Sequence, residues 1–283
     1  MVTKKDLRRY FVELLAECFG TCLLILIGEG GIANYKFSRQ LSHSTLPISI
    51  SFSVGVYIAL MVAGPVSGAH INPAVTISLM TVKIIKPIQC LFYIVGQMIG
   101  AFIGAVLVYF VYLNQFNEFD GGQRQLTGVN GTGDIFFTMP GNGIPHWNAF
   151  IDQMLITAIL MIFIMALSNK SNKMISEEGK PFAFALLILG ISCAFSVNAG
   201  TAMNPARDFG PRLFGSFVYG WSDVMRLDNY FFSIPILGPI VGATLGVWIY
   251  VGYSSLINNY SHRTNHQNQS NSNSSLETSQ QKI

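Results

Sequence analysis

Six apolar stretches, each close to the length of a membrane-crossing helix, constrain the fold of this chain more than any other feature. They cover residues 11–32, 46–63, 87–113, 148–167, 181–197 and 229–253. A helix needs ~20 mainly apolar residues to cross the ~30 Å hydrocarbon core of a bilayer. The composition agrees, because only 11% of the 283 residues are charged, against about 25% in an ordinary soluble domain. The sequence therefore predicts an all-α, multi-pass integral membrane protein with six transmembrane helices.

The tripeptide Asn-Pro-Ala occurs twice, each time between two of these stretches. The copies are Asn72, Pro73 and Ala74, and Asn204, Pro205 and Ala206. Asn is a preferred N-cap and Pro suits the first helical turn, so each copy predicts the start of a helix. The apolar residues that follow are too few to cross a bilayer, and backbone at the midplane is tolerated only where it lines a wet cavity. Two re-entrant half-helices that meet there predict a pore.

The two halves of the chain repeat each other. Glu17 and Thr21 in the first apolar stretch correspond to Gln153 and Thr157 in the fourth. The third and sixth stretches each carry Gly at every fourth position, at Gly96, Gly100 and Gly104 and at Gly238, Gly242 and Gly246. Such glycines let neighbouring helices approach closely. Because three crossings separate equivalent points, the second copy lies upside down. We expect an inverted repeat of about residues 11–113 and 148–253.

A carboxylate inside a membrane span is costly and marks a specific need. Glu17 is the clear example in this sequence, and Gln153 is its counterpart in the second half. We expect both side chains to accept hydrogen bonds from backbone N–H groups of the adjacent re-entrant loop. This support would turn the carbonyl groups of the loop toward the pore.

The basic residues predict the orientation. With six crossings both termini share one side, and that side holds eleven of the seventeen Lys and Arg residues. Cytoplasmic loops carry the excess of Lys and Arg, so we expect both termini in the cytoplasm. We take the plasma membrane as the host membrane. Residues 1–10 then form a cytoplasmic segment, residues 11–253 the membrane domain, and residues 254–283 a disordered cytoplasmic tail with too few apolar residues to bury a core.

Other classes of function fit the residues less well. The five histidines show no metal-ligand spacing, so we expect neither an enzyme nor a metal or other cofactor. The basic residues are spread through short loops, which gives no sign of nucleic-acid binding. A proton-coupled carrier needs a chain of intramembrane carboxylates or histidines, and only Glu17 clearly qualifies. An ion-coupled secondary transporter of a small polar solute stays as the alternative to a pore.

The two tripeptides and their surroundings resemble the major intrinsic proteins, or aquaporins. The matching segments are 67–74 (SGAHINPA) and 204–208 (NPARD), and the resemblance covers about residues 11–253. Within the family, residues that are similar to those of the glycerol-conducting branch, the aquaglyceroporins, are Asp208, Arg212, Pro235 and Ile236. The resemblance implies a homotetramer with one passive pore per subunit, which conducts glycerol, water and often urea and excludes ions and protons.

The resemblance also places the constriction of the pore, at Phe52, Ser192, Thr201 and Arg207. Arg207 would present a fixed fork of donors, and Phe52 an apolar wall. Ser192 stands where water-selective relatives place a His, so it leaves room for a polyol and adds a hydroxyl. Thr201 departs from the bacterial glycerol facilitators, which place a second aromatic residue there, so the constriction is expected to be wider and wetter.

The remaining implied contacts follow the path of the solute. The side-chain amides of Asn72 and Asn204 would donate hydrogen bonds to the passing oxygen. Backbone carbonyls would accept hydrogen bonds from it at Gly68, Ala69, His70, Gly200, Thr201 and Ala202. Separately, the sequon that begins at Asn130 lies in the long third loop, which the predicted orientation makes extracellular, and is a candidate glycosylation site.

Overall fold

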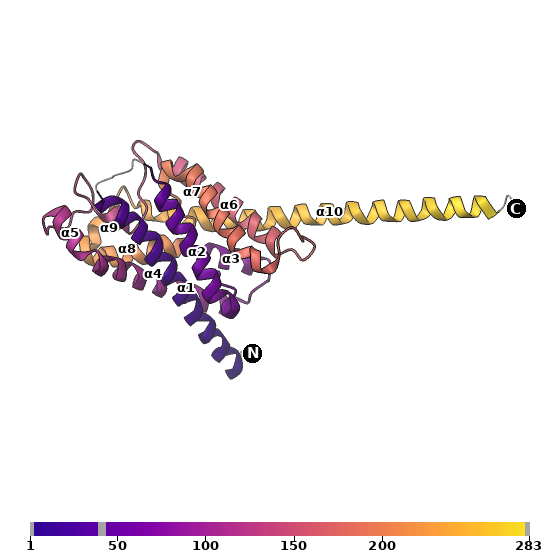
Figure 1. The fold of residues 1–283 in the computed structure, drawn as a ribbon, viewed down its shortest axis with the longest axis horizontal. Coiled ribbons are helices and arrows are strands. Elements are labelled where there is room, and N and C mark those ends of the chain that lie inside the picture. Colours follow the sequence, from indigo (N-terminus) through magenta and orange to yellow (C-terminus); the bar gives the residue numbers. More distant parts are fainter. Residues whose placement is uncertain (1–2, 39–43, 281–283) are drawn as a thin grey trace.

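The computed structural model describes residues 3–38 and 44–280, with side chains as far as residue 257 (Figure 1). Within these residues it contains six helices long and apolar enough to cross a membrane, which confirms the predicted number. They are α1 (Lys4–Phe37), α2 (Leu46–Ser67), α4 (Pro87–Val111), α6 (His146–Ser168), α7 (Lys180–Ala199) and α10 (Ile234–Gln280). The described part of the chain contains no strand.

In the described part of the chain, seven shorter elements connect these spans. Two are the half-helices predicted from the Asn-Pro-Ala copies, α3 (Pro73–Thr81) and α8 (Pro205–Tyr219). The others lie in the connections: α5 (Leu113–Asp120), α9 (Trp221–Arg226), and the 3-10 turns η1 (Gly133–Ile135), η2 (Glu177–Gly179) and η3 (Phe231–Ser233). The order span, span, half-helix, span occurs in each half of the chain, as an inverted repeat requires.

The first span begins earlier than its apolar residues indicate. Thr3 caps α1 by accepting a hydrogen bond from the backbone N–H of Asp6, and the Asp6 carboxylate accepts one from the backbone N–H of Thr3. This capping box starts the helix among basic residues, well before residue 11. Helix ends are therefore set here by local polar contacts, whereas apolar length sets only the part within the bilayer.

The tail differs from its sequence-based expectation. A disordered segment was expected from residue 254, but the backbone of α10 stays helical as far as Gln280 and extends well beyond the bundle (Figure 1). A helix that is already nucleated in the bundle can propagate without a second nucleation cost, even through polar residues that gain nothing from a core. Residues 281–283 of the expected tail lie outside the described residues.

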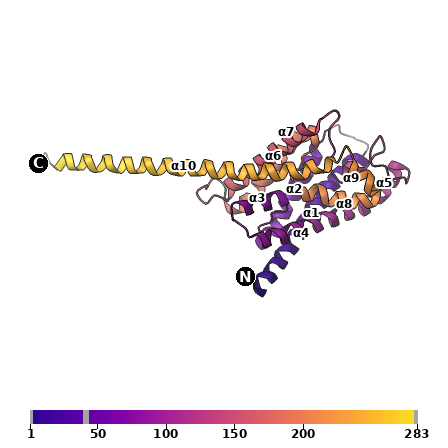
Figure 2. The ribbon, with the colours of Figure 1, turned by 180° about the vertical axis from the view of Figure 1, so that it is seen from behind.

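Each half-helix packs against the last span of the opposite half. Helix α3 contacts α10, and α8 contacts α4 (Figure 2). Within each half, the first and last spans pack side by side, α1 with α4 and α6 with α10. The start of α1 and the end of α10 lie at the end of the bundle away from α5 and α9 (Figures 1 and 2). The two halves are thus interlocked.

The predicted glycine ridges lie at the closest of these contacts. A Cβ atom at Gly96 or Gly100 of α4 would overlap the backbone carbonyl of Leu14 or Cys18 in α1. In the second half, a Cβ atom at Gly242 of α10 would overlap the carbonyl of Met154 in α6. The structural role predicted for these glycines is confirmed, because any larger residue would separate the helix pairs.

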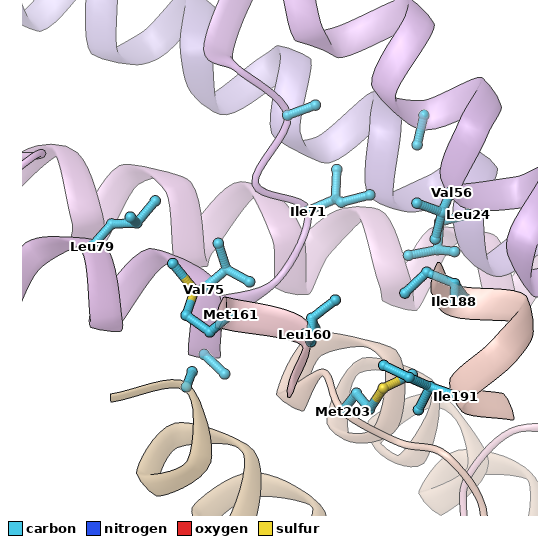
Figure 3. Packing of buried hydrophobic residues seen from close by; sticks show 14 of the residues in the cluster. Leu24, Val56, Ile71, Val75, Leu79, Leu160, Met161, Ile188, Ile191 and Met203 are labelled. Carbon is cyan, nitrogen blue, oxygen red and sulfur yellow. The ribbon is translucent and has the colours of Figure 1, made fainter. Parts of the chain in front are cut away.

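Apolar side chains from both halves surround the centre of the bundle. Figure 3 shows Leu24 of α1, Val56 of α2 and Ile188 of α7 in one cluster with the loop residues Ile71 and Met203. All five are almost fully buried. This packing fixes the two re-entrant loops relative to one another, and those loops carry the polar groups described next.

Candidate transport pore

The two Asn-Pro-Ala copies form matching helix starts. Asn72 Oδ1 accepts a hydrogen bond from the backbone N–H of Ala74 at 2.8 Å. Asn204 Oδ1 accepts one from the backbone N–H of Ala206 at 3.0 Å and one from that of Arg207 at 3.3 Å. Pro73 and Pro205 occupy the first positions of α3 and α8. Both asparagines are therefore fixed N-caps whose side-chain N–H groups point away from their own helices.

The two asparagines also bond across the centre of the molecule. Asn72 Nδ2 donates to the carbonyl of Met203 at 2.9 Å, and Asn204 Nδ2 donates to the carbonyl of Ile71 at 2.7 Å. A side-chain amide has two N–H groups, so each asparagine keeps one for another acceptor. Both residues line a narrow cavity of about 50 Å³, which has room for only a few water molecules.

Backbone strain accompanies these loops. Ile71 has φ 45° and Met203 has φ 50°, each directly before its asparagine. A left-handed conformation at a residue other than Gly costs on the order of 1–3 kcal/mol and persists only where the surroundings impose it. The strain occurs at equivalent places in both halves. It is therefore part of the backbone conformation that the two re-entrant loops share.

Glu17 supports the first loop. Its carboxylate accepts hydrogen bonds from the backbone N–H groups of His70 at 2.9 Å and Ile71 at 2.6 Å. Ser67 Oγ and Gln97 Nε2 donate to the same carboxylate at 2.6 Å and 2.7 Å. Hydrogen bonds to an ionised acceptor are about twice as strong as neutral ones. They offset the cost of the left-handed Ile71 and are the contacts expected of Glu17.

Gln153 supports the second loop, but it accepts a hydrogen bond from one backbone N–H group where Glu17 accepts from two. Its Oε1 accepts from the backbone N–H of Met203 at 3.2 Å, and its Nε2 donates to the carbonyl of Gly200 at 2.7 Å. Nε2 also donates to Asp152 at 3.1 Å, and Asp152 in turn accepts from Asn198 at 3.3 Å. The buried Asp152 thus orients the amide of Gln153, which sequence analysis did not anticipate.

The four residues predicted for the constriction line the same cavity: Phe52, Ser192, Thr201 and Arg207. Thr201 Oγ1 lies 3.3 Å from Ser192 Oγ, so the two hydroxyls form one polar corner. The guanidinium carbon of Arg207 lies 4.7 Å from the centroid of the Phe52 ring. The structure therefore brings together residues from α2, α7, the second loop and α8.

Asp208 and Arg212 bind the third loop and do not belong to the described lining of the narrow cavity. Both are fully buried, and Arg212 Nε donates to Asp208 Oδ1 at 2.9 Å. Asp208 also accepts from the backbone N–H of Thr138 at 2.8 Å, while Arg212 Nη2 donates to the Thr138 carbonyl at 2.8 Å. The Arg212 guanidinium stacks over Phe137 at 4.2 Å. This network ties residues 136–138 to α8 beside Arg207.

The other predicted residues are distributed as follows. His70 and Ala202 line the narrow cavity. Gly68, Ala69 and His70 line a second cavity of about 700 Å³, which shares Ile71 and Val75 with the first and so extends the path toward the start of α7. Gly200 is absent from the described lining of both cavities, because its carbonyl faces Gln153. Pro235 and Ile236 lie at the start of α10, outside both linings.

Sequence analysis missed one charged residue beside Arg207. Glu29 of α1 is fully buried, and its Oε1 lies 3.8 Å from Arg207 Nη1. The view that Glu17 is the one clear intramembrane carboxylate is therefore wrong. Glu29 already falls within the first apolar stretch, and that placement was the available signal. Among the described residues, no group of three or more His, Cys, Asp or Glu side chains could hold a metal ion.

Six spans and two half-helices that meet head to head at a narrow cavity lined by both asparagines define a class of protein: a multi-pass membrane protein with one path between two inverted repeats. Residues 4–250 match the family described as "MIP: Major intrinsic protein". The chain belongs to the major intrinsic protein family.

Individual relatives agree with this assignment. The chain is 40% identical to "Aquaporin-9" of Homo sapiens over 252 residues, which cover 89% of this chain and 84% of that protein. It is 38% identical to the "Glycerol uptake facilitator protein" of Pseudomonas aeruginosa, with 91% and 92% covered. Among solved structures, the aquaglyceroporin from Plasmodium falciparum matches with a TM-score of 0.77 and 28% identity, covering 85% of this chain and 95% of that one.

Proposed function

We propose that the protein is a passive channel for glycerol and water, and that urea and other small neutral solutes share its path. One observation carries the proposal: the narrow cavity is lined by both polar and apolar side chains. The polar side chains are Asn72, Ser192, Thr201, Asn204 and Arg207, and the apolar ones include Leu24, Phe52, Val56, Leu160 and Ile188. A polyol carries both hydroxyls and C–H groups, so it matches such a mixed lining.

The charges around the same cavity support the exclusion of ions. The N-termini of α3 and α8 meet at the asparagines, and each helix end carries roughly half a positive charge. Arg207 adds a permanent charge at the constriction. A cation would have to pass all three while giving up its water in a cavity of about 50 Å³, and pores of the aquaporin type exclude protons and cations by this combination.

The assembly and placement are also proposals. We infer a homotetramer with one pore per subunit in the plasma membrane, supported by family membership and by the many apolar side chains on the outer faces of the spans. We also propose that both termini lie in the cytoplasm, and the distribution of basic residues supports this orientation. Asn130 lies in an exposed turn at the opposite end and is proposed to carry a glycan.

Flux measurements on purified protein in liposomes test the proposed function. Stopped-flow shrinkage under sucrose, glycerol and urea gradients should show glycerol and water permeabilities at least tenfold above those of protein-free liposomes, with a weak temperature dependence. The ion-coupled alternative requires a driving ion. Accumulation of glycerol above its external concentration under a proton or sodium gradient, or a glycerol-dependent current, would disprove the passive channel.

A further inference from the structure

The buried carboxylate of Glu29 has a cationic neighbour, Arg207. Its Oε1 lies 3.8 Å from Arg207 Nη1. Neither carboxylate oxygen accepts a hydrogen bond from any protein group in the described residues. An isolated buried carboxylate is very costly unless a charge of opposite sign lies nearby. The nearby carboxylate of Asp208 is already engaged by Thr138 and Arg212, so Arg207 is the counter-charge of Glu29.

The guanidinium of Arg207 contacts protein groups through Nη1, and its other donors are left for the cavity. Nη1, which faces Glu29, also donates to the carbonyl of Phe136 at 3.2 Å. Among the described residues, neither Nε nor Nη2 donates to a protein acceptor. The guanidinium has five N–H donors in a rigid plane. Holding the Nη1 edge against the wall therefore directs the other donors toward the cavity that Arg207 lines.

The preceding residue, Gly28, lies against Phe52, whose ring packs against the Arg207 guanidinium. A Cβ atom at Gly28 would overlap the Phe52 ring. The absence of a side chain at Gly28 therefore lets the ring lie back against α1. Neither Gly28 nor Glu29 lines the narrow cavity, yet each contacts one residue that does.

We propose that Gly28 and Glu29 are specificity-determining positioning residues: Glu29 holds the Arg207 guanidinium against the wall, and Gly28 makes room for the Phe52 ring. This inference rests on the proposed function, since it assumes that Phe52 and Arg207 select the solute. Loss of either support moves a large side chain into the path. Because glycerol is wider than water, its passage should suffer more.

Two substitutions test the role of Glu29: one removes its charge and the other keeps it. In Glu29→Gln the shape is kept and the charge is lost, so the glycerol-to-water permeability ratio should fall at least fivefold while water permeability stays within twofold. Glu29→Asp keeps the charge and should retain at least half of the ratio. Glu13→Gln is the matched control, because Glu13 is a buried carboxylate of the same helix that pairs with Arg9 and Gln89 instead.

Gly28 is tested independently. Gly28→Ala should lower the glycerol-to-water ratio at least threefold, and adding Phe52→Leu should return it to the value of Phe52→Leu alone. Gly30→Ala is the control, since a Cβ atom there meets nothing within 4 Å. The inference is overturned if Glu29→Gln matches Glu13→Gln in the ratio, or if Gly28→Ala matches Gly30→Ala. Absence of glycerol flux in the unsubstituted protein would instead reject the proposed function.

Discussion

At the scale of single residues, the hydroxyl corner of Ser192 and Thr201 is the most informative part of the constriction. Ser192 is buried, lines the narrow cavity and lies 3.3 Å from Thr201 Oγ1. It is a small side chain in the cavity that Arg207 also lines. The space beside it, more than its single hydrogen bond, is what admits a three-carbon solute.

Two substitutions separate space from hydrogen bonding at this position. Ser192→Ala removes one hydroxyl, a change of ~1 kcal/mol that slows glycerol only several-fold. Ser192→His fills the space and should nearly abolish glycerol and urea flux while water flux persists. Stopped-flow measurements on liposomes with equal protein content check both variants. If Ser192→His reaches the membrane normally and leaves the glycerol-to-water ratio unchanged, Ser192 does not form the constriction.

The sequence predicts residues well where the cause is local. Asn72 and Asn204 act as N-caps through atoms two or three residues away, so their role follows from the tripeptide itself. Glu29 is different, because its partner Arg207 lies in the other half of the chain. Nothing near Glu29 in the sequence indicates which face of α1 meets the constriction. The same limit applies to Asp152, whose contact with Asn198 depends on how α6 and α7 pack.

At the scale of elements, the glycine ridges of α4 and α10 set the spacing between spans. Gly100 faces the carbonyl of Cys18, where a Cβ atom would overlap backbone that cannot move aside. Overpacking of this kind typically costs about 1–3 kcal/mol. The backbone of α1 also carries Glu17 and Glu29, so a shift at this contact is transmitted to both supports of the pore.

A pair of matched substitutions measures this contact. Gly100→Ala should lower the midpoint of thermal unfolding in detergent by several degrees and reduce the amount of folded protein in the membrane. Gly190→Ala in α7 meets nothing within 4 Å and should leave the midpoint unchanged or raise it slightly, because Ala favours helix more than Gly does. Equal midpoints for the two variants would show that the ridge tolerates a methyl group.

Element boundaries are less predictable than element identity. The six spans follow from apolar length, but α1 begins at a capping box and α10 continues through a polar tail. The half-helix α8 runs to Tyr219 although Arg207, Asp208 and Arg212 interrupt its apolar residues. Those charges are accommodated by the Asp208–Arg212 pair and by the third loop. Such compensation depends on contacts that sequence periodicity does not reveal.

At the scale of the whole molecule, the two ends of the bundle differ in what they present. The start of α1 and the end of α10 both extend from the end of the bundle away from α5, while Asn130 lies beside α5 and the end of α1. With an epitope at residue 283 and a second one inserted beside Asn130, antibodies should label the inserted epitope on intact cells. The C-terminal epitope should need permeabilisation. The reverse pattern would invert the proposed orientation.

The paired bonds between each asparagine and the opposite loop have a consequence for the order of biosynthesis. The ribosome delivers residues 1–113 long before Met203 and Asn204 exist. Until those residues arrive, the Ile71 carbonyl and the Asn72 amide lack the partners that they have in the finished molecule. Unpartnered backbone at membrane depth is costly, so the first loop gains its stable position only after α8 has entered. A chain released before that point has membrane spans but no pore.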